Sequence, residues 1–252
     1  MYRTFHLALS VVILLFAVCA FGQTDLDSQQ QDQHPQGDES RSDSTSNASA
    51  PAPDAKKQQP KRILGVMPNF RAVSAGAIPP PPTWRHAFKI ASQNSFDYSS
   101  FLFVGFTSAI ADAEGVHKQL GHGIPGYWGY YWRGFVDKTD GNYLVIFALP
   151  TVFHQDERYY ALGKGSIWKR TWYSASRILI TPNYAGHPSV NFSELLGRGA
   201  AQGISISYYP SQDRTAGAIM EKWGYALMRD ALTNVFREFW PDIATHVLHR
   251  HP

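Results

Sequence analysis

Cysteine is nearly absent from this chain of 252 residues, because Cys19 is the only one. It closes an apolar run over Leu7–Val18 that follows the basic Arg3, and the small residues Ala20 and Gly22 come next. This order of basic, apolar and small residues predicts a secretory signal peptide over residues 1–22. The run is shorter than the roughly 20 apolar residues that span a bilayer. We therefore expect an exported protein of the periplasm or cell envelope. Association with a membrane stays open.

Disulfide bonds are excluded from the mature chain if cleavage follows Gly22, because no cysteine then remains. A lipoprotein signal with acylation at Cys19 stays open as the alternative, although Val18 stands where such signals need a small side chain. With cleavage after Gly22, stability must come from a buried core, for which the chain is long enough.

Strong net charge is also missing, and residues 63–252 hold 17 basic against 13 acidic side chains. So mild an excess does not predict a nucleic-acid-binding protein. Residues 23–62 contain few apolar side chains and many Gln, Ser and Pro, which predicts a disordered low-complexity linker. An extended proline-rich arm over 63–82 and a helical domain over 83–252 complete the expected organisation, and we find no internal repeat.

Strand signals are scarce in that domain. Tyr143–Phe153 suits a strand in composition, but no second run of similar quality could pair with it, so we expect a short buried helix there. Apolar residues elsewhere recur with a helical period. The sequence predicts an all-α fold, a compact bundle of five to six helices with glycine- and alanine-rich packing faces.

Several residues predict where helices begin and end. Asp97 can cap one helix and Gly115 can end it, while Pro125 suits the first turn of a second helix that reaches Phe135. Asp140-Gly141 should then form a turn. Three later helices are expected over Ser166–Ile180, from Asn191 or Ser193 to Ser207, and over about Arg214–Trp240, where Pro241 should end the last.

Glycine is frequent inside these helices, although each interior glycine costs about 1 kcal/mol relative to alanine. Close approach of another helix would offset that cost. We therefore expect Gly199 and Gly203 to lie against a neighbouring helix, in a tightly packed bundle.

Motifs of common enzymes are missing as well. Neither the serine elbow G-x-S-x-G nor the zinc motif H-E-x-x-H occurs, and the G-x-G-x-x-G string over 121–126 follows no strand. We expect no cofactor and no metal. One dense polar cluster remains, in which His154 could act as a base, Asp156 could orient it, and Glu157 and Arg158 stand beside them. The other interpretation is a polar segment at the end of a helix, with its charged side chains in solvent.

Aromatic side chains cluster, and those most suited to a binding surface are Trp128, Trp132, Trp168 and Trp172. Tryptophan beside Lys or Arg is typical of a lipid headgroup boundary, although aromatic residues at helical spacing more often form a core. Both readings stay open.

Four further residues are candidates for buried polar positions. Glu194 and Arg198 lie one helical turn apart, a pair that is usually solvated. Asp230 and Asn234 fall on or beside the apolar stripe of the last helix, where a carboxylate needs a partner such as Arg177 or Arg158.

The segments His154–Tyr160, Phe192-Ser193-Glu194, Tyr208-Tyr209-Pro210 and Glu238–Asp242 resemble a family of exported bacterial helical proteins with no assigned activity. The resemblance covers most of residues 83–243. It implies a shared fold and export, and it transfers no catalytic residue.

Two functions of different class are therefore open. The first is a non-catalytic binding role in the cell envelope, with a membrane surface, an apolar ligand or an envelope protein as partner. The second is a hydrolase of phosphate or ester groups built on His154, Asp156 and Arg158. The sequence favours the first and leaves the oligomeric state undetermined.

Overall fold

The computed structural model describes residues 59–246. Helices take up 64% of these residues, and the strands within them are only two or three residues long. The predicted predominance of helix is confirmed, whereas the short strands were not predicted. The predicted signal peptide, Cys19 and most of the predicted linker lie outside the described residues.

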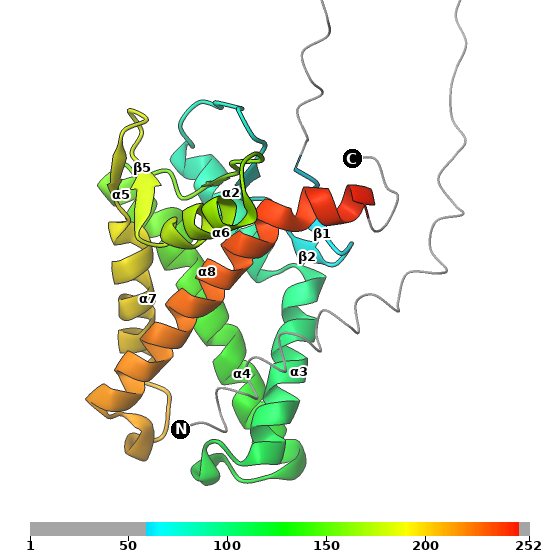
Figure 1. Cartoon of the computed structure of the whole chain (residues 1–252). Coiled ribbons are helices and arrows are strands. Elements are labelled where there is room, and N and C mark those ends of the chain that lie inside the picture. The colour runs from blue at the N-terminus through cyan, green and yellow to red at the C-terminus, as the bar shows by residue number, and fades with distance from the viewer. Residues whose placement is uncertain (1–58, 247–252) are drawn as a thin grey trace, which may run out of the picture. The chain divides into compact units, whose positions relative to one another are not determined.

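Six helical runs follow one another in the described residues when α4, η2 and α5 are counted as one (Figure 1). In Figure 1, α3 and α4 lie side by side, and both α6 and α7 pack on α8. The helices are α2 (Trp84–Ser95), α3 (Tyr98–Glu114), α4 (Gly123–Asn142), the π-helix η2 (Tyr143–Ala148), α5 (Leu149–Phe153), α6 (Ile167–Ser176), α7 (Phe192–Ser205) and α8 (Ala216–His246), with the 3-10 turns η1 (Lys118–Leu120) and η3 (Ser211–Asp213) before α4 and α8.

Three small strand pairs accompany the helices. Their strands are β1 (Arg62–Ile63) antiparallel to β2 (Met67–Pro68), β3 (Ala72–Val73) parallel to β4 (Tyr159–Tyr160), and β5 (Ile180–Pro182) antiparallel to β6 (Pro188–Val190). β1 begins within the range expected to be linker, and β3 lies in the expected arm. Ile63 and Val73 are buried, so this part of the chain packs as part of the fold.

Helix caps follow the sequence closely. The side chain of Asp97 accepts from the N–H of Ser99 at the start of α3, and Gly115 ends that helix with a left-handed φ of 61°. Pro125 lies in the first turn of α4, and the Asn191 side chain caps α7. These predictions are confirmed because each depends on local backbone chemistry.

The run Tyr143–Phe153 is helical, as predicted, and its first part forms the π-helix η2. Val145 and Ile146 are buried, and Ile146 packs with Ile90 of α2. Among the described helices, none combines the length and the apolarity needed to cross a membrane.

The predicted turn at Asp140-Gly141 is wrong, because α4 continues through both residues. A Cβ on Gly141 would lie 2.6 Å from Nη1 of Arg198, so the Arg198 guanidinium of α7 packs directly on the glycine backbone. Gly197 of α7 has a similar role, since a Cβ there would lie 2.7 Å from Cγ2 of Val145. Close approach explains these two glycines.

The predicted helix contact of Gly203 is wrong. A Cβ on Gly203 would meet nothing within 4 Å, and one on Gly199 would meet only the indole of Trp223, at 3.7 Å. Gly197 is therefore the glycine of α7 that a close neighbour requires, whereas Gly199 makes only an ordinary contact with α8.

Pro241 lies inside α8, so the predicted helix end before it is wrong. Proline has no N–H to donate to the carbonyl of Arg237, four residues earlier. That carbonyl lies 3.5 Å from Nε2 of Gln59, and Nη2 of Arg170 donates to the following carbonyl, of Glu238, at 2.7 Å. Side chains from two other segments therefore meet the helix carbonyls at this turn.

Polarity is inverted in α6 and α7. These helices bury charged and hydroxyl side chains and expose large apolar ones. The buried set contains Arg170, Ser174, Ser193, Glu194, Arg198 and Ser205, and the exposed set contains Ile167, Trp168, Trp172, Phe192, Leu196 and Ile204. The second half of α8 buries Asn234, Arg237 and Glu238 together with the apolar Trp240.

Candidate functional site

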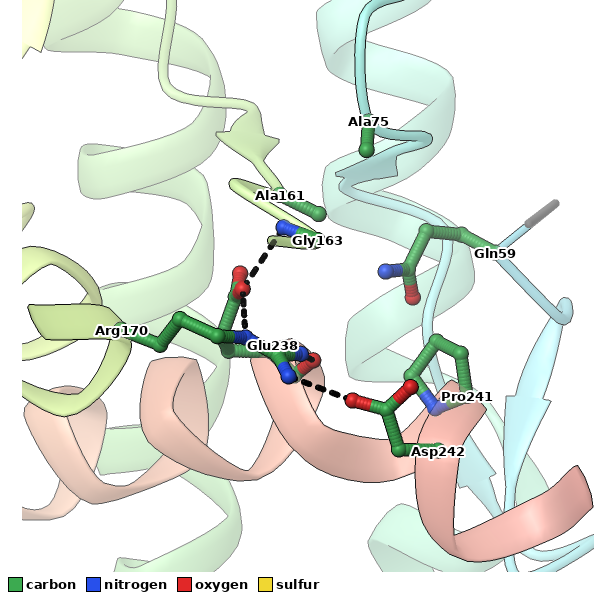
Figure 2. Close-up of a pocket in the computed structure, with 8 residues that line it drawn as sticks. All are labelled: Gln59, Ala75, Ala161, Gly163, Arg170, Glu238, Pro241 and Asp242. Atoms are coloured by element: carbon green, nitrogen blue, oxygen red, sulfur yellow. Dashed lines mark hydrogen bonds and ion pairs between the residues drawn. The ribbon is translucent and has the colours of Figure 1, made fainter. Parts of the chain in front are cut away.

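Glu238 of α8 holds the chain before α6 in place with a fully buried carboxylate (Figure 2). Its Oε2 accepts from the Tyr159 hydroxyl at 2.7 Å and from the N–H of Leu162 at 2.9 Å. Its Oε1 accepts from the N–H of Gly163 and from Nε of Arg170, both at 2.8 Å. Burial and the hydrogen bond to Glu238 raise the pKa of Tyr159. One carboxylate thus ties β4, the following loop and α6 to α8.

Arg170 completes this anchor from α6. Its Nη1 donates to Asp242 at 2.6 Å, and its guanidinium lies 4.5 Å from the ring centre of Phe239. Burial alone would lower the pKa of Arg170, but its hydrogen bonds to Glu238 and Asp242 outweigh burial and raise it. The adjoining cavity has a volume of about 10 Å³, which is room for about one water molecule. This cluster therefore holds α6 in position and offers no space for a substrate.

The anchor determines which face of α6 points outward. Ser166 caps the helix through its side chain, while Arg170 and Ser174 point inward. Trp168 and Trp172 lie one turn apart on the opposite side, with 84% and 79% of their surfaces exposed. A buried arginine thus directs two indole rings into solvent.

Lysine flanks the two indoles. Lys164 lies in the loop before α6 and Lys169 in its first turn, and both are exposed. No Asp or Glu occurs from Tyr159 through Ser193. We use the term α6 face for Lys164, Ile167, Trp168, Lys169 and Trp172.

The other two predicted tryptophans lie elsewhere, on the first half of α4. Cζ of Arg133 lies 4.3 Å from the ring centre of Trp132, and the ring centres of Trp132 and Tyr208 are 5.7 Å apart. Trp128 lies against the rings of Tyr127 and Tyr131. In Figure 1 the start of α4 lies at the far end of that helix from α6. The four tryptophans grouped by sequence therefore occupy two separate places, and those of α4 are partly covered by neighbouring side chains.

The His154 cluster is only partly brought together. Nε of Arg158 donates to Asp156 at 2.8 Å and the Tyr160 hydroxyl donates at 2.7 Å, so the Asp156 carboxylate is occupied. His154 is exposed at the end of α5 with a φ of 53°, and its ring lies against that of Tyr184. Asp156 and Arg158 form a salt bridge, and the histidine stands outside it.

Glu157 points away from this pair into the protein. Its Oε2 has no hydrogen-bond partner among residues 59–246, while Nη2 of Arg71 donates to its backbone carbonyl at 2.7 Å. Burial raises the pKa of Glu157 to about 7, even though the Arg71 charge opposes the shift. Glu157 is a buried carboxylate that destabilises the fold when it ionises.

Glu194 and Arg198 of α7 are buried, so the usual solvated pair is not found here. Nε of Arg198 donates to Glu194 at 2.9 Å, and its Nη2 lies 2.6 Å from Oδ2 of Asp230. The expectation that Arg177 or Arg158 would pair with Asp230 is wrong. Burial opposes ionisation of Asp230, but Arg198 and Arg229 outweigh it and lower its pKa.

Asn234 is buried one turn further along α8, where its Oδ1 accepts from Nη1 of Arg237 at 3.1 Å. This contact lies within α8, whereas the pair of Arg198 with Asp230 is the one that joins α7 to α8.

Sequence reasoning missed Glu238 and Asp242 as the residues that position the site. Their spacing places both on one face of α8, one turn apart, which is the signal that could have found them. No three His, Cys, Asp or Glu side chains within residues 59–246 are grouped so as to hold a metal ion.

No known protein family, curated protein or solved structure matches this chain.

Proposed function

We propose that this chain is an exported, non-catalytic cell-envelope protein that binds a membrane surface through the α6 face. The observation that carries the proposal is the outward placement of Trp168 and Trp172 beside exposed lysines. Indole rings are partly apolar and partly polar, and they concentrate where hydrocarbon meets headgroups. Export rests on the sequence pattern of residues 1–22.

Energetics support a contact at this face. A tryptophan side chain buries about 150–250 Å² when it is fully covered. At about 25 cal/mol per Å², each indole offers on the order of 4 kcal/mol, of which partial insertion gains a fraction. The pair is therefore sufficient for reversible association with a lipid surface.

Rigidity supports the same function. Arg170 and the loop N–H groups are held by Glu238, so the outward orientation of α6 exists before binding. Ordering costs on association are correspondingly small.

The hydrolase alternative has less support. Asp156 is occupied by Arg158 and Tyr160, and the exposed His154 contacts Tyr184 instead of the carboxylate. A base without an orienting partner and without an enclosing pocket lacks two features of such a site.

The test is partition of the mature chain onto phospholipid vesicles, measured by flotation. Trp168→Ala combined with Trp172→Ala should reduce the partition coefficient at least tenfold, because the main anchors are lost. Trp128→Ala combined with Trp132→Ala is the matched control and should keep most of the binding. Circular dichroism of each variant checks that the fold is retained.

Two results would contradict the proposal. One is that the wild-type chain fails to float with any vesicle. The other is that both tryptophan pairs contribute equally, which would remove the special role of α6.

A further inference from the structure

The charged side chains of the α6 face are both positive. Lys164 and Lys169 are exposed, whereas the nearest carboxylates on α8, those of Glu238 and Asp242, are held by Arg170. No acidic residue occurs over 159–193, so the charged side chains that this segment presents beside the indoles are positive.

The loop before α6 places Lys164 just ahead of the first turn of the helix, which carries Lys169. Gly163 and Gly165 both have left-handed φ values, of 67° and 112°, which turn the chain sharply on either side of Lys164. A Cβ on Gly165 would lie 3.5 Å from Cδ of Lys169, so the stem of that lysine passes along the loop. Both lysine side chains therefore project from the N-terminal end of α6.

The backbone adds to this field. Free N–H groups at the first turn of a helix carry partial positive charge, and the N-terminal end of α6 is the end that carries both lysines. Oε1 of Glu238 accepts from the N–H of Gly163 at 2.8 Å, so the loop that carries Lys164 is fixed in position.

We propose that the α6 face selects an anionic bilayer, with Lys164 and Lys169 contacting lipid headgroups while Trp168 and Trp172 enter the interface beneath them. The inference rests on the proposed function and specifies its partner. Charge complementarity decides the kind of membrane, and the indoles supply the apolar contact.

The experiment compares two vesicle types, phosphatidylcholine alone and phosphatidylcholine mixed with phosphatidylglycerol. Each lysine near an anionic surface is expected to strengthen binding about fivefold. Lys164→Gln combined with Lys169→Gln should therefore weaken binding to the mixed vesicles roughly 25-fold and leave binding to pure phosphatidylcholine unchanged. Raised salt should weaken wild-type binding to the mixed vesicles only.

The matched control removes two positive charges elsewhere, with Lys118→Gln in η1 and Arg214→Gln after η3. Binding of this control to the mixed vesicles should stay within about twofold of wild type, because the starts of α4 and α8 lie away from α6 (Figure 1) and salt screens charges over roughly 10 Å. Equal losses in the two double variants would show a general charge effect and overturn the role of the α6 face.

Failure of the two proposals can be told apart. Equal wild-type binding to both vesicle types overturns the anionic selection and leaves membrane binding intact. Binding to neither overturns membrane binding itself. Binding to soluble polyglutamate and to neither vesicle would identify an acidic protein as partner and overturn both.

Discussion

Replacement of Glu238 by glutamine tests the anchor beneath α6 most directly. The amide has the same size, but its NH₂ group must face donors in either orientation. Toward Oε1 it meets the N–H of Gly163 and Nε of Arg170, and toward Oε2 it meets the N–H of Leu162 and the Tyr159 hydroxyl. The phenol can rotate to accept, whereas the backbone and guanidinium donors cannot.

The expected loss follows from these contacts. Hydrogen bonds to a charged group are worth about 1.5–3 kcal/mol each, and removal of one partner of a buried ion pair costs about 3–5 kcal/mol. Glu238→Gln should therefore reduce the free energy of unfolding by about 3–5 kcal/mol. For a domain of this size each kcal/mol lowers Tm by about 2–4 °C, so the fall is on the order of 10 °C.

Urea unfolding followed by circular dichroism measures this change, with Asp242→Asn as the matched control. Asp242 also binds Arg170, at 2.6 Å, but a quarter of its side chain is exposed and water can replace it. We expect a loss of about 1 kcal/mol for the control. A Glu238→Gln variant no less stable than Asp242→Asn would refute the claim that Glu238 is the centre of the anchor.

Further predictions concern the interior and the surface. The pKa of Glu157 is about 7 in the fold against an ordinary 4.5, so the stability present below pH 4.5 is lost as pH rises to 7. Over 2.5 units this amounts to ~3 kcal/mol. Glu157→Gln should remove this part of the decline in urea titrations at several pH values, and an unchanged slope would contradict the prediction. Gly197→Ala should destabilise by about 1–3 kcal/mol because its Cβ meets Val145, whereas Gly203→Ala should stabilise by up to ~1 kcal/mol, and equal melting midpoints would count against this contrast. On vesicles, the α6 tryptophan and lysine pairs should each lose binding that their matched controls retain.

Local signals were sufficient for much of the secondary structure. Asp97, Gly115 and Asn191 act through hydrogen bonds or φ values within a few residues of themselves, so the sequence predicts the helix ends they form. The helical state of Tyr143–Phe153 could be reasoned from the lack of a strand partner.

Distant contacts explain the errors. Gly141 stays helical because Arg198, far along the chain, packs on its bare backbone. Pro241 is accepted inside α8 because Gln59 and Arg170 reach the carbonyls that surround it. Neither partner can be identified from the local sequence, so a turn and a helix end were the natural expectations.

The site that the sequence groups around His154 is only partly assembled in the structure, for a related reason. His154, Asp156 and Arg158 were grouped because they are close in the chain, yet φ at His154 turns the ring away from the salt bridge. Glu238 and Arg170 lie 68 residues apart and were not associated. Apolar periodicity also predicts an apolar inner face, which α6 and α7 do not have.

Inverted polarity links the anchor to the proposed membrane contact. If α6 met only water outside, exchanging its faces would bury Trp168 and Trp172 and expose Arg170, which the hydrophobic effect favours. The chain instead buries Arg170 against two carboxylates, an arrangement that a well-packed apolar core often equals or exceeds in stability. Burial of Arg170 with the indoles outside becomes the more stable orientation of α6 when the outer face contacts a partner instead of water. An anionic lipid surface would cover the indoles and attract the lysines at once, and it is the partner that we propose for this orientation of α6.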